Sequence, residues 1–178
     1  GLILGLPRDT YHSFLDSLEF AIQLRPYSLY IHELLVLPGS EFFNKASEFN
    51  IVFDKKPPHK IISNGSMSSD EYNELKYLGF SVSLLHHVEP VRKMILEYYN
   101  GLTGRRLVDL FIEFVDFLQT KDFFPTKESI SKMDSIDFDP TYEKFKTNSE
   151  FVFSLANHFN EFKDELCLEN LKQEKKVA

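Results

Sequence analysis

The stretch that decides the fold is Gly1-Leu2-Ile3-Leu4-Gly5-Leu6-Pro7-Arg8-Asp9-Thr10. A short apolar run stops at a Gly-Leu-Pro turn, and an acidic residue and a threonine then open a segment with helical periodicity. This order predicts a strand that enters a helix through a tight loop, as in a βα unit. Because a parallel strand cannot form a sheet by itself, we expect the chain to be the later part of a larger protein.

The residues that follow continue the same alternation of strand and helix. Residues 10–24 carry apolar side chains at helical spacing, and Thr10 is suited to cap that helix. A continuous apolar run then predicts a buried strand. We therefore expect residues 2–6 and 29–37 to be neighbouring parallel strands, joined by the 10–24 helix in a right-handed βαβ unit.

A turn and an irregular region come after the second strand. Ser40 follows a Pro-Gly turn and is suited to cap a short helix. Residues 51–53 and 61–62 are the apolar parts of the next stretch, and we expect them to be short strands on either side of a loop. We place a domain boundary after residue 67.

From residue 68 onward the pattern is helical. Ser68 and Glu71 fit a capping box, in which each side chain accepts a hydrogen bond from the other residue's backbone N–H. Four apolar stripes at helical spacing follow: Leu75, Leu78, Val82 and Leu85; Val91, Met94, Ile95 and Tyr98; Leu107, Leu110, Phe111, Phe114, Val115 and Leu118; and Val152, Leu155, Phe159, Phe162 and Leu166. The predicted fold class is thus α-rich α/β, with a βα region at 1–67 and an all-helical domain at 68–178.

The composition limits the classes of function. The chain has 178 residues, 43% of them hydrophobic, and 18 phenylalanines, which are enough for an aromatic core. Its net charge is −7 and it has no long basic run, so we expect no nucleic-acid partner. No apolar run approaches the ~20 residues of a membrane span, and we expect no signal peptide. A single cysteine fits a reducing compartment, and we expect a cytoplasmic protein.

The opening stretch resembles the late barrel motif of radical S-adenosylmethionine (SAM) enzymes, a Gly-x-Ile-x-Gly-Leu-Pro-Gly-Glu-Thr sequence after one of the last strands. The residues that match are Gly1, Ile3, Gly5, Leu6, Pro7 and Thr10, with Asp9 in place of Glu and Arg8 in place of the second Gly. A second similarity is the strand end at 34–40, which resembles the Pro-Gly-Thr turn after the next strand. Residues 57–68 are similar to the segment after the barrel in cobalamin-binding-type members.

The resemblance implies that residues 1–67 are the C-terminal remnant of a radical SAM barrel and that 68–178 are an appended helical domain. The parent would use SAM and a [4Fe–4S] cluster, and whether it also takes cobalamin is left open. The residues implied to border SAM are Ile3, Gly5, Leu6, Pro7 and Leu37. The cluster needs three thiolates, and the chain has only Cys167, so we expect this part to bind no iron, to hold no catalytic residue and to be inert alone.

The expected partner is the upstream barrel of the parent chain. Strand edges and apolar faces cut from a barrel need covering, so we also expect the isolated chain to form homo-oligomers. The alternative function is that of a self-contained α-helical protein-interaction module with no catalytic role. A Cys-x-x-x-Cys-x-x-Cys motif upstream would separate the two hypotheses.

Two further groups of residues invite a chemical interpretation. Only His86 and Glu89 of the His86-His87 region share a helix face, and two ligands are too few for a zinc site. We therefore expect this region to be a solvated helix end. Cys167 has acidic neighbours that oppose its ionisation, so a nucleophilic role is not expected.

Overall fold

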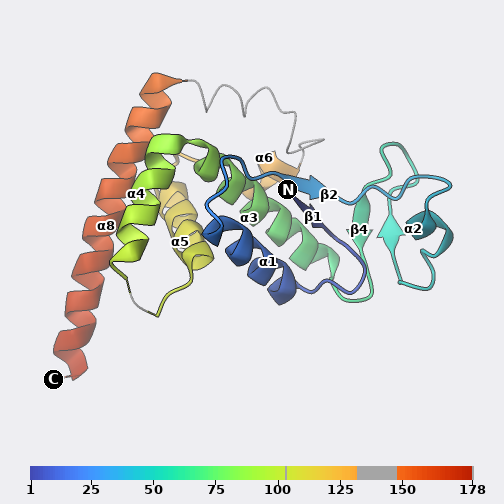
Figure 1. Cartoon of the computed structure of the whole chain (residues 1–178), viewed down its shortest axis with the longest axis horizontal. Coiled ribbons are helices and arrows are strands. Elements are labelled where there is room, and N and C mark those ends of the chain that lie inside the picture. Colours follow the sequence, from blue (N-terminus) through green and yellow to red (C-terminus); the bar gives the residue numbers. More distant parts are fainter. Residues whose placement is uncertain (103, 132–147, 178) are drawn as a thin grey trace.

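The structure is a computed structural model that describes residues 1–102, 104–131 and 148–177 (Figure 1). The strands are β1 (Leu2–Leu4), β2 (Ile31–Glu33), β3 (Val52–Phe53) and β4 (Ile61–Ser63), and the helices are α1 (Tyr11–Gln23), α2 (Glu41–Asn44), α3 (Ser69–His87), α4 (Glu89–Asn100), α5 (Leu107–Thr120), α6 (Lys127–Ser131) and α8 (Ser149–Val177). Helices dominate and the sheets are small, which confirms the α-rich fold class. Among the described residues, no helix has the length and apolar character needed to cross a membrane.

The predicted parallel pairing of the first two strands is confirmed. β1 and β2 pair in parallel with Leu2 opposite Ile31 and Leu4 opposite Glu33, and α1 connects them. Thr10 caps α1 as expected, because its side chain accepts a hydrogen bond from the backbone N–H of Ser13 at 3.1 Å.

The second strand is shorter than the sequence predicts. We expected a strand over 29–37, but β2 ends at Glu33. After that residue the chain pairs with a different segment, and this pairing is antiparallel. Leu35 forms an antiparallel bridge with Lys60, and the Val36 N–H donates to the His59 carbonyl at 2.9 Å. The apolar run is therefore shared between two pairing partners.

The second sheet and a short helix form one end of the molecule, far from α8 (Figure 1). β3 and β4 are the short strands expected on either side of a loop, and the structure pairs them antiparallel. Ser40 caps α2 by accepting from the Phe43 N–H at 3.2 Å, but this helix is only one turn long.

The central element is α3, which begins at the predicted Ser68–Glu71 capping box. It packs against β1, β2 and β4 on one side and against α1, α4, α5 and α6 on others. An ideal Cβ on Gly79 would lie 3.2 Å from Ile31 Cγ2, so a glycine lets α3 approach β2 closely. As a result α3 is buried around most of its surface instead of along one stripe.

The helical half closes around an aromatic cluster. α8 runs along α4 and α5 (Figure 1). The ring of Phe114 on α5 lies 5.0 Å from that of Phe159 and 5.3 Å from that of Phe162 on α8. Such edge and tilted ring contacts add to the free energy gained by burying the rings.

One hydrophobic cluster includes residues from both sides of the expected boundary. Leu4 and Ile31 belong to it, as do Leu75 of α3 and Phe114 of α5. The division into 1–67 and 68–178 stays a prediction, and residue 68 is the cap at which α3 begins.

We predict that Phe114→Ala lowers the free energy of unfolding by about 3–5 kcal/mol, because the ring is fully buried and its loss leaves a cavity. Phe153→Ala on α8 is the control, since that side chain is 68% exposed, and its effect should stay within about 0.5 kcal/mol. Urea unfolding followed by circular dichroism measures both. Equal losses in the two variants would contradict the proposed core.

Candidate functional site

The candidate site lies where β1 and β2 end at their carboxyl edges. Ligands of parallel α/β sheets bind at this edge, in the loops that follow the strands. The loop here begins with Gly5, which is buried and has a φ of 95°. An ideal Cβ on Gly5 would lie 2.9 Å from Ile61 Cγ2 and 3.1 Å from Tyr72 Cε2. Both its backbone angle and its packing therefore require glycine.

Arg8 completes the loop in a conformation that is uncommon for its residue type. Its φ is 73°, in the left-handed region that glycine adopts without strain. The loop thus has a backbone suited to glycine at both position 5 and position 8, although only Gly5 is one.

The Asn64 side chain binds the backbone of the loop that begins at Gly5. Its side-chain amide donates to the Gly5 carbonyl at 3.3 Å and to the Leu6 carbonyl at 3.1 Å. Its own Oδ1 accepts from the Ser66 N–H at 2.8 Å. The Asn64-Gly65 pair predicts only a turn, because no local sequence pattern shows that the Asn64 side chain reaches a loop 59 positions away in the chain.

A buried charge cluster lies on the helix side of the same edge. The Glu33 side chain is 6% exposed, and its Oε1 lies 3.1 Å from Lys76 Nζ and 3.4 Å from Lys60 Nζ. The Tyr72 hydroxyl donates to Glu33 Oε2 at 2.9 Å. Burial and the Glu33 carboxylate raise the pKa of Tyr72, so the phenol stays protonated and acts as a donor. These residues line a cavity of about 230 Å³.

The opposite face of the strands is exposed. Ile3 of β1 lies on it and pairs with His32 of β2, which is also exposed. Leu35 and Leu37, which follow β2, and Ile62 on β4 are further large apolar side chains that are exposed. α1 and α3 both contact β1 and pack against each other, so they cover the other face (Figure 1). Within the described part of the chain, β1 pairs only with β2, and its outer edge has no strand beside it.

The predicted site residues are only partly brought together. Ile3 is 46% exposed on the face away from the helices, two residues before the contiguous loop of Gly5, Leu6 and Pro7. Leu37 is 49% exposed but lies beyond the 34–36 pairing, in the turn that leads to α2. The single Cys167, which is exposed on α8, does not fit an iron–sulfur cluster.

The expectation of a solvated helix end at His86 and His87 is wrong. His86 is 0% exposed and His87 is also buried, because α4 folds back directly after α3. Within the described residues, neither ring nitrogen of His86 has a hydrogen-bond partner. Burial, together with the nearby charge of Arg92 and the ring of His87, lowers the pKa of His86 from 6.5 to about 4. Among all the residues that the structure describes, no group of three or more His, Cys, Asp or Glu side chains is placed to hold a metal.

No protein-family model matches the chain, and a search of curated proteins finds no match. The features that point to a function are therefore the residues at the carboxyl edge of β1 and β2 and the motif that they carry.

We predict that Gly5→Ala lowers the free energy of unfolding by about 2–4 kcal/mol, since it combines backbone strain with overlap against Ile61 and Tyr72. Gly39→Ala is the matched control, because Gly39 also has a positive φ of 84° but no heavy atom within 4 Å of its ideal Cβ. Its loss should be about 1 kcal/mol. Urea titration measures both, and a smaller loss for Gly5→Ala than for Gly39→Ala would contradict the packing of the loop.

We predict that His86 destabilises the fold as the pH falls from 6.5 towards 4. The folded state holds the neutral ring with a lowered pKa, so the unfolded state takes up the proton first and is favoured on acidification. His86→Leu should remove on the order of 3 kcal/mol of this loss. Melting temperatures between pH 4 and 7 test it, with the exposed His12→Ala as control. Parallel curves for His86→Leu and wild type would refute the assignment.

Proposed function

We propose that this chain is the C-terminal part of a radical SAM enzyme, in which β1 and β2 are late strands of the βα barrel and the 68–178 helices are an appended domain. The observation that carries the proposal is the parallel βαβ unit, which has helices on one face and the exposed Ile3 on the other, and whose β1 edge has no strand beside it among the described residues. A two-stranded parallel sheet of this kind is rarely stable alone.

The geometry of a βα barrel explains these exposed surfaces. Helices form the outer ring of such a barrel, and the side chains on the other face of each strand point inward. With α1 and α3 as part of the outer ring, Ile3 would face the interior. The free edge of β1 would pair with the preceding strand, and the loop at Gly5 would lie at the catalytic end of the barrel.

The loop backbone supports the same proposal. The motif has glycine at the positions of Gly5 and Arg8, and both residues have the positive φ that glycine favours. Arg8 keeps this conformation although it has a side chain, which is what a loop shaped by its surroundings would require.

Each part of the protein would supply different groups. SAM bound at a reduced [4Fe–4S] cluster supplies the 5′-deoxyadenosyl radical that abstracts hydrogen from substrate. From this chain, Ile3 would provide an apolar wall for the adenine, and Gly5, Leu6 and Pro7 would provide backbone that a nucleoside can approach closely. Leu37 would also border SAM and add an apolar side chain to the wall of that pocket. The cluster cysteines would come from upstream residues, since this chain has one cysteine.

The proposal also bears on partners and location. The upstream barrel would cover the β1 edge and the sheet face on which Ile3 is exposed. A second copy of this chain would cover them when the upstream part is absent. Oxygen-sensitive cluster chemistry and a single cysteine favour the cytoplasm. The alternative function, a helical interaction module without catalysis, would use the same exposed face to dock another protein.

The test uses the full-length protein with its upstream residues, purified without oxygen. We expect a Cys-x-x-x-Cys-x-x-Cys motif upstream, bound iron and the formation of 5′-deoxyadenosine from SAM. Ile3→Asp should raise the KM for SAM at least tenfold with unchanged iron content, because it places a charge against the adenine. Ile62→Asp is the control, since Ile62 is also exposed but lies on β4.

The opposite results decide against the enzyme. An upstream sequence without the three cysteines, or a full-length protein that cleaves no SAM, would leave the interaction module as the function. Equal effects of Ile3→Asp and Ile62→Asp on the KM would remove Ile3 from the SAM site.

A further inference from the structure

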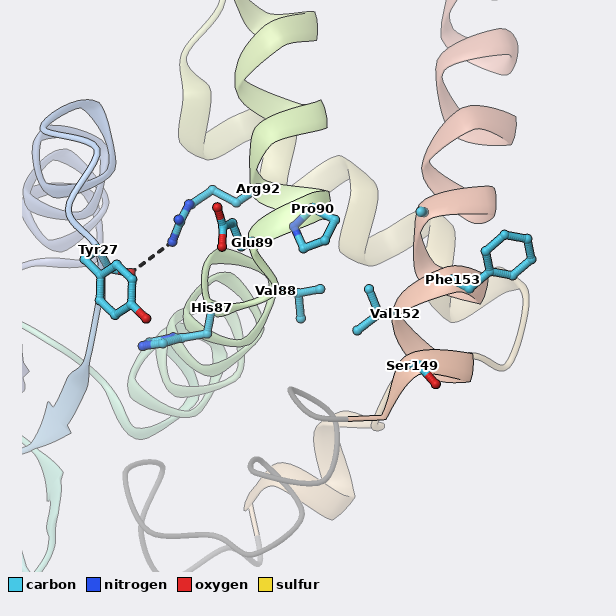
Figure 2. A pocket seen from close by; sticks show the side chains of 10 residues that line it. Tyr27, His87, Val88, Glu89, Pro90, Arg92, Ser149, Val152 and Phe153 are labelled. Atoms are coloured by element: carbon cyan, nitrogen blue, oxygen red, sulfur yellow. Dashed lines mark hydrogen bonds between the residues drawn. The ribbon is translucent and has the colours of Figure 1, made fainter.

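A second cavity lies at the opposite end of α3 from the Gly5 loop. It has a volume of about 580 Å³ and is formed by the end of α3, the start of α4, the loop after α1 and the start of α8 (Figure 2). Cavities of a few hundred Å³ or more hold small organic ligands. Nothing in the proposed SAM site makes use of it.

The two ends of this cavity differ in polarity. Tyr27, His87 and Arg92 lie at one end, and Val88, Val152 and Phe153 lie towards the other (Figure 2). Phe153 is 68% exposed, so an aromatic ring stands at the apolar rim without being buried by the protein itself. The arrangement suits a ligand with a polar head and an apolar body.

Arg92 is held in place at the polar end. Its Nη1 donates to the Tyr27 carbonyl at 2.9 Å and to the His86 carbonyl at 3.0 Å, which joins the loop after α1 to the end of α3. Within the described residues, its Nε–H and Nη2–H groups make no hydrogen bond. These are the groups with which a guanidinium binds a carboxylate through two parallel hydrogen bonds. A fixed side chain also loses little entropy when it binds.

The neighbouring side chains His87 and Glu89 have defined contacts as well. The His87 Nδ1 lies 2.7 Å from the Ser83 carbonyl, which can only accept, so Nδ1 carries the proton. Among the described residues that line the cavity, Glu89 is the one carboxylate, and it pairs with Lys93 at 2.6 Å. The Lys93 ammonium, together with the charge of Arg92, lowers the pKa of Glu89. Because Lys93 pairs with Glu89, Arg92 supplies the positive charge for a ligand at this end.

We propose that this cavity binds a small organic carboxylate with an aromatic or branched apolar body. The carboxylate accepts hydrogen bonds from Arg92, and the apolar body lies against Val88, Val152 and the ring of Phe153. One arginine beside a wall of apolar side chains matches a monocarboxylate better than a multiply charged phosphate, which needs several donors and cations. The proposal does not depend on the radical SAM assignment.

The test is a titration of the 178-residue chain with phenylacetate and with its uncharged analogue phenylacetamide, followed by protein NMR. We expect saturable shifts at Arg92, Val152 and Tyr27 with phenylacetate, and at least tenfold weaker binding of phenylacetamide. The comparison of two ligands needs no variant, so it holds even if a substitution disturbs the fold. No saturable shift up to millimolar phenylacetate, or equal binding of the two ligands, would overturn the proposal.

Two variants locate the binding site. Val152→Trp should fill the apolar part of the cavity and abolish binding without touching Arg92. Arg92→Gln should weaken phenylacetate at least tenfold and leave phenylacetamide unchanged. Phe20→Trp, at an exposed position of α1 outside the cavity, is the control and should bind like wild type. Retained phenylacetate binding in Val152→Trp would place the ligand elsewhere.

Discussion

The close contact between α3 and β2 determines how the other elements are arranged. At Gly79 the helix backbone comes so near to Ile31 that a Cβ would have to displace that side chain. α3 is then buried against both strands and helices, so it connects the βα part of the chain with the helical part. Its first turn supports the Gly5 loop through Tyr72, and its last turn ends beside the carboxylate cavity.

The same contact explains why a buried charge cluster can exist between α3 and the end of β2. Removing carboxylates and ammonium groups from water is costly, and only close pairing with further hydrogen bonds offsets that cost. α3 provides both Lys76 and Tyr72 to Glu33, and Lys60 comes from the segment that pairs with Leu35. A buried pair of this kind constrains geometry more than it adds stability. It fixes where α3 lies relative to the end of β2, and with it the position of the loop that begins at Gly5.

What the sequence could predict was local. Thr10, Ser40 and Ser68 were identified as caps because capping depends on residues three positions apart. The parallel pairing followed from the order of apolar runs. The burial of His86, and the roles of Asn64 and Glu33, depend on elements far away in the chain and leave no periodic signal. The length of β2 was overestimated for the same reason, since a run of apolar residues does not reveal where a strand changes its partner.

The hydrogen bonds of Asn64 to Gly5 and Leu6 also constrain the order of folding. They join residues 59 and 58 positions apart, so the chain must close a long loop before they form. Neighbouring helices such as α3 and α4 meet over much shorter distances in sequence, and contacts of that kind form faster. We therefore expect the helical half to fold first and the loop to be ordered last. We also expect the amides of this loop to exchange with solvent deuterium before those of α3 and α5.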